Sequence, residues 1–98
     1  MTENDKQLIE TMEAKYDAFN PKLEALRKAV EDFQNHYDDY IALKDFYGSD
    51  DWYRLYDQPH DDVKCGVLSQ DQLFNLITDH NDLLKNFLEF APSMYKNM

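Results

Sequence analysis

The feature that most constrains this chain is a line of large apolar side chains that recur every three or four residues between Met12 and Tyr40. Steps of three and four residues keep side chains on one face of an α-helix, and a sustained run forms the a/d seam through which helices pack together. Leu8 and Tyr47 extend the line at its ends. The seam therefore predicts helix packed on helix, and its members are Met12, Tyr16, Phe19, Leu23, Leu26, Val30, Phe33, Tyr37 and Tyr40.

Pro21 interrupts this seam and leaves two arrangements open. A proline inside a helix removes one hydrogen bond and clashes with the preceding turn, at a cost of about 3 kcal/mol. Asn20 and Pro21 together also suit the first residues of a new helix. The seam keeps its register across Pro21, which favours one kinked helix, whereas the length of such a helix favours two. We expect a break or a sharp kink, with helices over about 4–19 and 21–47.

Turn signals follow the seam. Gly48 is a typical helix stop, and Ser49 precedes a short predicted helix over about 50–57 that Pro59 ends. Residues 60–66 are polar and irregular.

The last element has the clearest start. Ser69 with Gln72 forms a capping box, and Leu68 with Leu73 forms the matching hydrophobic staple. The predicted helix covers about 69–90, Pro92 marks its end, and residues 93–98 are expected to fray. Its apolar stripe consists of Leu73, Leu76, Ile77, His80, Leu83, Leu84, Phe87 and Leu88.

These elements predict an all-α fold in a single domain over residues 1–98. We expect a small helical bundle in which two long helices, about 21–47 and 69–90, pack antiparallel. The N-terminal helix adds to the bundle or extends the first long helix, and the short connecting helix closes one end. Two glycines and three prolines among 98 residues are too few for a β fold with many tight turns.

Charge limits the partners. Twenty acidic and ten basic residues give a formal net charge of −10, and the excess of acid is spread along the chain. Such a surface repels nucleic-acid phosphates and anionic lipid, so we expect direct binding to neither nucleic acid nor membrane. The single cysteine, Cys65, excludes an internal disulfide and fits a reducing compartment. No signal peptide or transmembrane run is evident, and the expected location is the cytoplasm.

No residue pattern indicates catalysis, a cofactor or a metal. His60, Asp61, Asp62 and Cys65 match no established zinc or calcium spacing, and Cys65 has no base placed by sequence to activate it. The Asp–Asp pairs are adjacent in sequence, so their side chains point in different directions on a helix. His80 lies on the apolar stripe, where we expect a core histidine hydrogen-bonded to a facing Tyr or Asp. We therefore expect no enzyme activity.

Aromatic residues gather around the connector. Tyr47, Trp52, Tyr53 and Tyr56 either pack the connector against the helices or form an acid-rimmed surface for a partner, since such side chains suit cores and interfaces alike.

Two segments carry a family resemblance. Phe46-Tyr47-Gly48-Ser49-Asp50-Asp51-Trp52, and Lys64-Cys65-Gly66-Val67-Leu68-Ser69-Gln70-Asp71 leading into Leu73-Phe74-Asn75-Leu76, resemble the family called domain of unknown function 4298. The family comprises short proteins of Gram-positive bacteria, and the resemblance covers about residues 10–88. It implies a compact helical domain and supplies no activity, ligand or catalytic residue.

Two functions follow as hypotheses. The first is a non-enzymatic interaction protein with an unknown protein partner, or a homodimer through the seam around residues 8–26, because the seam is longer than the last helix can cover. The alternative is an acidic decoy that imitates nucleic acid and binds a basic nucleic-acid-binding protein.

Overall fold

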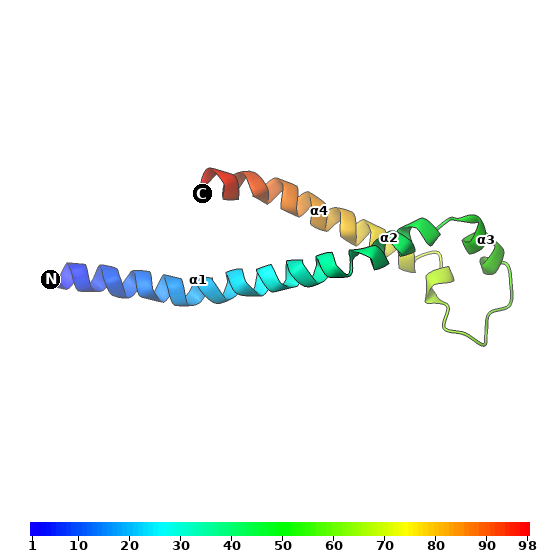
Figure 1. Ribbon diagram of the computed structural model, residues 1–98, viewed down its shortest axis with the longest axis horizontal. Coiled ribbons are helices and arrows are strands. Elements are labelled where there is room, and N and C mark those ends of the chain that lie inside the picture. The colour runs from blue at the N-terminus through cyan, green and yellow to red at the C-terminus, as the bar shows by residue number, and fades with distance from the viewer. The chain divides into compact units, whose positions relative to one another are not determined.

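The structure, a computed structural model, describes all 98 residues and contains four α-helices, one short 3₁₀ turn and no strands (Figure 1). The all-α prediction is confirmed, but the predicted compact bundle is not, since no residue of α1 is buried. The chain divides into two units, Met1–Asp38 and Asp39–Met98. The elements are α1 (Glu3–Asn35), α2 (Tyr37–Phe46), α3 (Asp50–Tyr56), η1 (Gly66–Leu68) and α4 (Gln72–Lys96).

The first unit is dominated by α1, a single helix of 33 residues. It begins at a capping box that the sequence analysis missed: the Thr2 hydroxyl accepts from the Asp5 N–H at 3.1 Å, and the Asp5 carboxylate accepts from the Thr2 N–H at 3.2 Å. The helix then runs through Pro21 without a break. The break expected between helices over 4–19 and 21–47 is therefore wrong, and the helix is continuous across Pro21, although it ends at Asn35 rather than near residue 47.

Pro21 lies on the side of α1 opposite the seam, whereas Pro92 follows Leu88 by four residues and lies at the edge of the apolar stripe of α4. Pro21 is exposed in α1, and Pro92 is exposed in α4, which continues to Lys96. Each proline forfeits one hydrogen bond to the carbonyl four residues earlier, and neither ring is buried. The helix end expected at Pro92 and the frayed tail over 93–98 are wrong, since the Asn97 side-chain amide donates to the Ser93 carbonyl at 2.7 Å.

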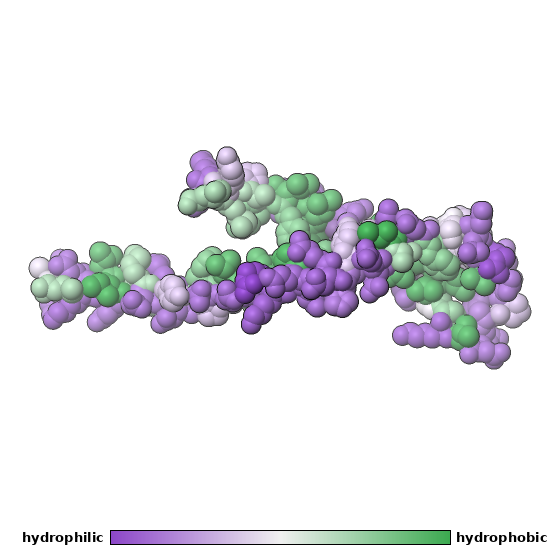
Figure 2. All heavy atoms as spheres, viewed as in Figure 1, coloured by the Kyte–Doolittle hydropathy of each residue, from purple (hydrophilic) through white to green (hydrophobic).

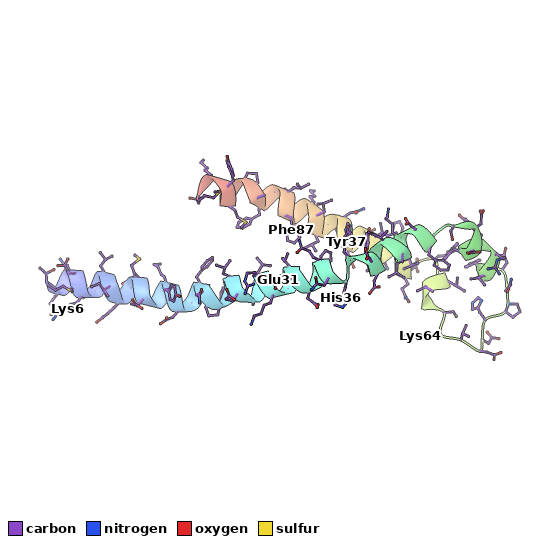
Figure 3. All side chains as sticks on the ribbon, viewed as in Figure 1. Lys6, Glu31, His36, Tyr37, Lys64 and Phe87 are labelled. Atoms are coloured by element: carbon purple, nitrogen blue, oxygen red, sulfur yellow. The ribbon has the colours of Figure 1, made fainter.

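The actual break in the long helical region falls at His36, between α1 and α2; Figure 3 labels His36 and Tyr37 at this junction. His36 Nδ1 lies 2.8 Å from the Asp32 carbonyl oxygen, which also accepts from the His36 backbone N–H at 3.2 Å. A side chain that shares the carbonyl of the preceding turn competes with the regular helical pattern. The predicted helix over 21–47 is thus divided here.

The second unit folds back on itself. The Tyr40 ring of α2 stacks on the His80 ring of α4 at 3.9 Å, and the Tyr47 hydroxyl donates to the Gln70 carbonyl at 3.4 Å. Tyr40 comes before Tyr47 in the sequence, whereas its partner His80 comes after Gln70. This part of α2 and the start of α4 therefore run antiparallel.

A small core fills the turn between them. Trp52, Leu68 and Leu73 are the buried residues, with Trp52 6% and Leu73 2% exposed. The Trp52 Nε1–H donates to the Val67 carbonyl at 2.9 Å, so burial of the indole leaves no polar atom unsatisfied. This hydrogen bond ties α3 to the residues of η1.

The start of α4 realises half of the predicted capping box. The Ser69 hydroxyl accepts from the Gln72 N–H at 3.1 Å. The second hydrogen bond of a capping box, from the Ser69 N–H to the Gln72 side chain, is replaced: the Ser69 N–H donates to the Gly66 carbonyl at 3.0 Å. Leu68 and Leu73, the predicted staple, are both buried. The helix itself begins at Gln72, three residues later than expected.

No helix has both the length and the apolar character required to span a membrane.

Candidate interaction surfaces

The apolar face of α1 is one candidate surface. No residue of this helix is buried. Green, apolar atoms gather along one side of α1 in Figure 2. Each of the large apolar side chains on the helix retains between 42% and 63% of its accessible surface: Leu8, Ile9, Met12, Tyr16, Phe19, Leu23, Leu26 and Phe33. A continuous exposed stripe of this kind is typical of an interaction site.

Ile9 is the residue of this face that the sequence analysis missed. The three- and four-residue steps continue backwards from Met12 to Ile9, whereas Leu8 lies beside the line. Ile9 is 46% and Leu8 58% exposed. The spacing alone would have located it. With Ile9 included, the steps from residue 9 to residue 33 alternate strictly between three and four.

Charged side chains flank the face. The Arg27 guanidinium donates to Glu24 at 2.9 Å and to Glu31 at 2.7 Å. These two hydrogen bonds raise the pKa of Arg27. All three side chains are about half exposed, so the pairs add little stability but they hold the guanidinium at the edge of the apolar face.

The four aromatic residues proposed as a partner surface form one cluster centred on Trp52. The Tyr56 ring stacks on the indole at 5.2 Å, while Tyr47 and Tyr53 meet it edge-on at 5.3 and 5.1 Å. The Gln70 amide donates to the Tyr56 hydroxyl at 3.3 Å. Trp52 is therefore a core residue. Tyr53 and Tyr56 keep exposed faces, and their role towards a partner stays a prediction.

His80 is half-buried in α4 and stacked on Tyr40, with its Nδ1 3.1 Å from the Asn81 side-chain oxygen. The Tyr40 ring of α2 therefore contacts His80 by stacking, whereas the expected hydrogen bond to a facing Tyr or Asp stays a prediction. The structure thus places His80 at the packing surface between α2 and α4.

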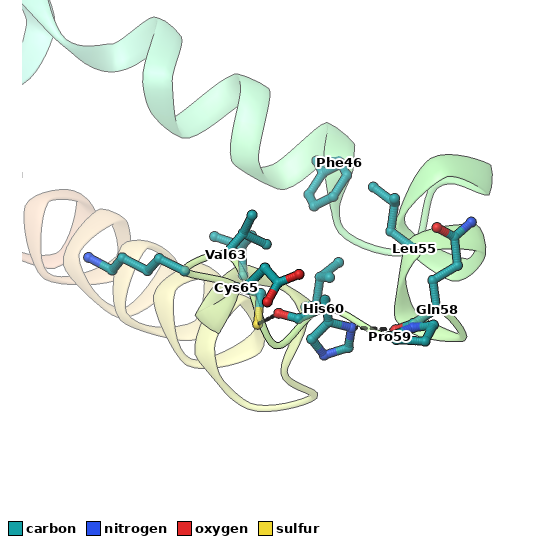
Figure 4. Close-up of a pocket in the computed structure, with 11 residues that line it drawn as sticks. Phe46, Leu55, Gln58, Pro59, His60, Val63 and Cys65 are labelled. Carbon is teal, nitrogen blue, oxygen red and sulfur yellow. Dashed lines mark hydrogen bonds between the residues drawn. The ribbon is translucent and has the colours of Figure 1, made fainter.

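A hollow of about 400 Å³ lies beside the connector loop (Figure 4). Cys65 lines it, and its thiol lies 3.6 Å from the His60 carbonyl; His60 Nδ1 in turn lies 2.6 Å from the Gln58 carbonyl. No three His, Cys, Asp or Glu side chains anywhere in the chain are grouped so that they could hold a metal ion. The wall is otherwise mostly apolar, formed by Phe46, Leu55, Pro59, Val63, Val67 and Leu68 with Asp62 and Lys64.

These features define an all-α protein with a long amphipathic helix in its first unit and a small aromatic core in its second. The chain belongs to the family described as domain of unknown function DUF4298, which matches residues 9–90. The family resemblance inferred from the sequence is confirmed. No curated protein matches the chain significantly.

Proposed function

We propose that this protein is a non-enzymatic interaction protein that associates with itself through the apolar face of α1. The helical bundle expected from the sequence then arises between copies of the chain. One observation carries the proposal: α1 has 33 residues and buries none of them, although large apolar side chains line one face.

Helix physics supports a partner for this face. An isolated helix is only marginally stable in water, and most helical stability in proteins comes from packing of the apolar face. Pro21 makes α1 weaker still, because it removes a hydrogen bond from the middle of the helix. A second helix packed on the apolar face would supply the missing stabilisation through burial of hydrocarbon.

The test compares the molar mass in solution of the unaltered chain with that of a variant whose apolar face on α1 is disrupted. Light scattering coupled to size exclusion should give a dimer at tens of micromolar for the unaltered chain. The double variant Leu23→Glu, Leu26→Glu should be monomeric, because it places four carboxylates in the interface of a dimer.

The matched control is Ala14→Glu, Ala18→Glu, which adds the same charge to exposed positions outside the stripe. It should leave the molar mass unchanged. A monomer at all concentrations for the unaltered chain, or equal behaviour of the two double variants, would contradict the proposal.

A further inference from the structure

We infer that two copies of α1 pair antiparallel, in a register centred on Pro21. This inference rests on the proposed self-association and adds its orientation. Its starting point is the unbroken helix Glu3–Asn35, which carries the seam from Ile9 to Phe33 as one line. A strict alternation of three- and four-residue steps over this length is the repeat of a coiled coil, and its natural partner is a helix with the same repeat.

The antiparallel register centred on residue 21 pairs every seam residue of one copy with a seam residue of the other. In this register, a residue that precedes residue 21 by a given number of positions lies opposite the partner residue that follows residue 21 by the same number. The layers are Ile9 with Phe33, Met12 with Val30, Tyr16 with Leu26, and Phe19 with Leu23, each occurring twice by symmetry. No large apolar side chain of the seam is left over.

Side-chain size favours this arrangement over a parallel one. Every aromatic residue of the seam meets an aliphatic one, so three of the four layers have similar volume and only Met12 with Val30 is smaller. A parallel pair would stack Phe19 on Phe19 and Val30 on Val30, so the volumes of the layers would differ more widely. Because interhelical distance depends on the side chains at the contact, uneven layers leave voids or force the helices apart.

Charge favours the same orientation. Residues 3–19 carry five acidic and two basic side chains, whereas residues 20–35 carry three of each. A parallel pair sets the acidic halves side by side. An antiparallel pair sets each acidic half beside a neutral one, which reduces the repulsion.

The charged residues on either side of the seam also favour the antiparallel orientation. A parallel pair brings Lys22 beside Arg27 of the other helix on both sides. The antiparallel pair brings Glu13 beside Arg27 twice and Lys22 beside its own copy once. The guanidinium has five N–H donors, so its bonds to Glu24 and Glu31 leave donors for a third carboxylate.

The available area is sufficient. A large apolar side chain that is fully exposed has an accessible surface of roughly 180 Å². If each of the eight seam side chains buries about half of that area, roughly 90 Å², two copies bury about 1,400 Å² together. This lies within the range of stable, specific interfaces, so no additional contact is required.

Disulfide trapping tests the orientation. In a Cys65→Ser background, Met12→Cys and Val30→Cys chains are mixed in equal amounts, equilibrated in a glutathione buffer and analysed by non-reducing mass spectrometry. The antiparallel register brings these two positions together, and the mixed disulfide should exceed either homodisulfide at least tenfold. In this register the two copies of residue 12 lie about 27 Å apart, far beyond the roughly 7 Å that a disulfide allows.

The control pairs Met12→Cys with Phe19→Cys, which the register separates by about 16 Å along the helix axis, and should give little mixed disulfide. A dimer that yields the Met12→Cys homodisulfide is parallel; this overturns the inference and leaves self-association standing. A dimer that yields neither product, or both mixed disulfides equally, also overturns the register. A monomer by light scattering removes the proposed function and the inference together.

Discussion

Individual residues hold the second unit together, and Trp52 does so in three ways. Its indole is buried, its Nε1–H donates to Val67 across 15 positions of sequence, and three tyrosine rings surround it. The sequence predicts this cluster but does not distinguish a core from an interface. The decision depends on which side of Trp52 the residues of η1 cover, and no local pattern specifies that.

Leu73 provides the sharpest residue-level prediction. Its side chain is 2% exposed, whereas that of Leu76, on the same predicted stripe, is 38% exposed. Leu73→Ala should lower the free energy of unfolding by about 2–5 kcal/mol, because it opens a cavity in the core. Leu76→Ala, the matched control, should cost less than about 1 kcal/mol, since solvent already reaches that site. Urea denaturation followed by tryptophan fluorescence measures both. Equal costs for the two variants would refute the core assignment.

At the scale of elements, an interior proline ends neither of the two long helices. Pro21 and Pro92 are both exposed, and both helices continue through them. The helix instead breaks at His36, where no glycine or proline stands. Local breaker rules therefore misplaced these boundaries, because one lost hydrogen bond is outweighed by the intact turns on either side.

Pro21→Ala should strengthen α1. The substitution restores an N–H that can donate to the Asp17 carbonyl, and alanine is the best helix former. Local opening of the helix around residues 17–25 should become harder by up to about 3 kcal/mol. Amide hydrogen exchange measured by mass spectrometry on peptides from this segment should show slower exchange. Pro59→Ala, a loop substitution, is the control and should leave these amides unchanged. Unaltered exchange in Pro21→Ala would show that the proline does not limit the stability of α1.

At the scale of the whole molecule, charge opposes the association that the apolar face favours. Each chain carries a formal net charge of −10. Two like-charged chains repel one another, and salt screens that repulsion, while burial of apolar surface persists.

The dimer should therefore tighten as salt rises. Raising the ionic strength from about 0.05 M to about 0.5 M shortens the Debye length severalfold, and the dissociation constant should fall by roughly threefold or more. Sedimentation equilibrium at both salt concentrations measures this change. Weaker association at high salt would show that attractive ion pairs, rather than the apolar face, supply most of the binding free energy.

The sequence by itself determined that the chain is helical, which face of each helix is apolar, and where α3 begins, because spacing and capping are local properties of the chain. Only the tertiary structure decided which apolar residues are buried. Leu73 and Trp52 lie inside the second unit, whereas the equally apolar face of α1 remains in contact with solvent. Periodicity identifies a face, but burial requires another surface to reach it, and that depends on contacts between segments distant in sequence.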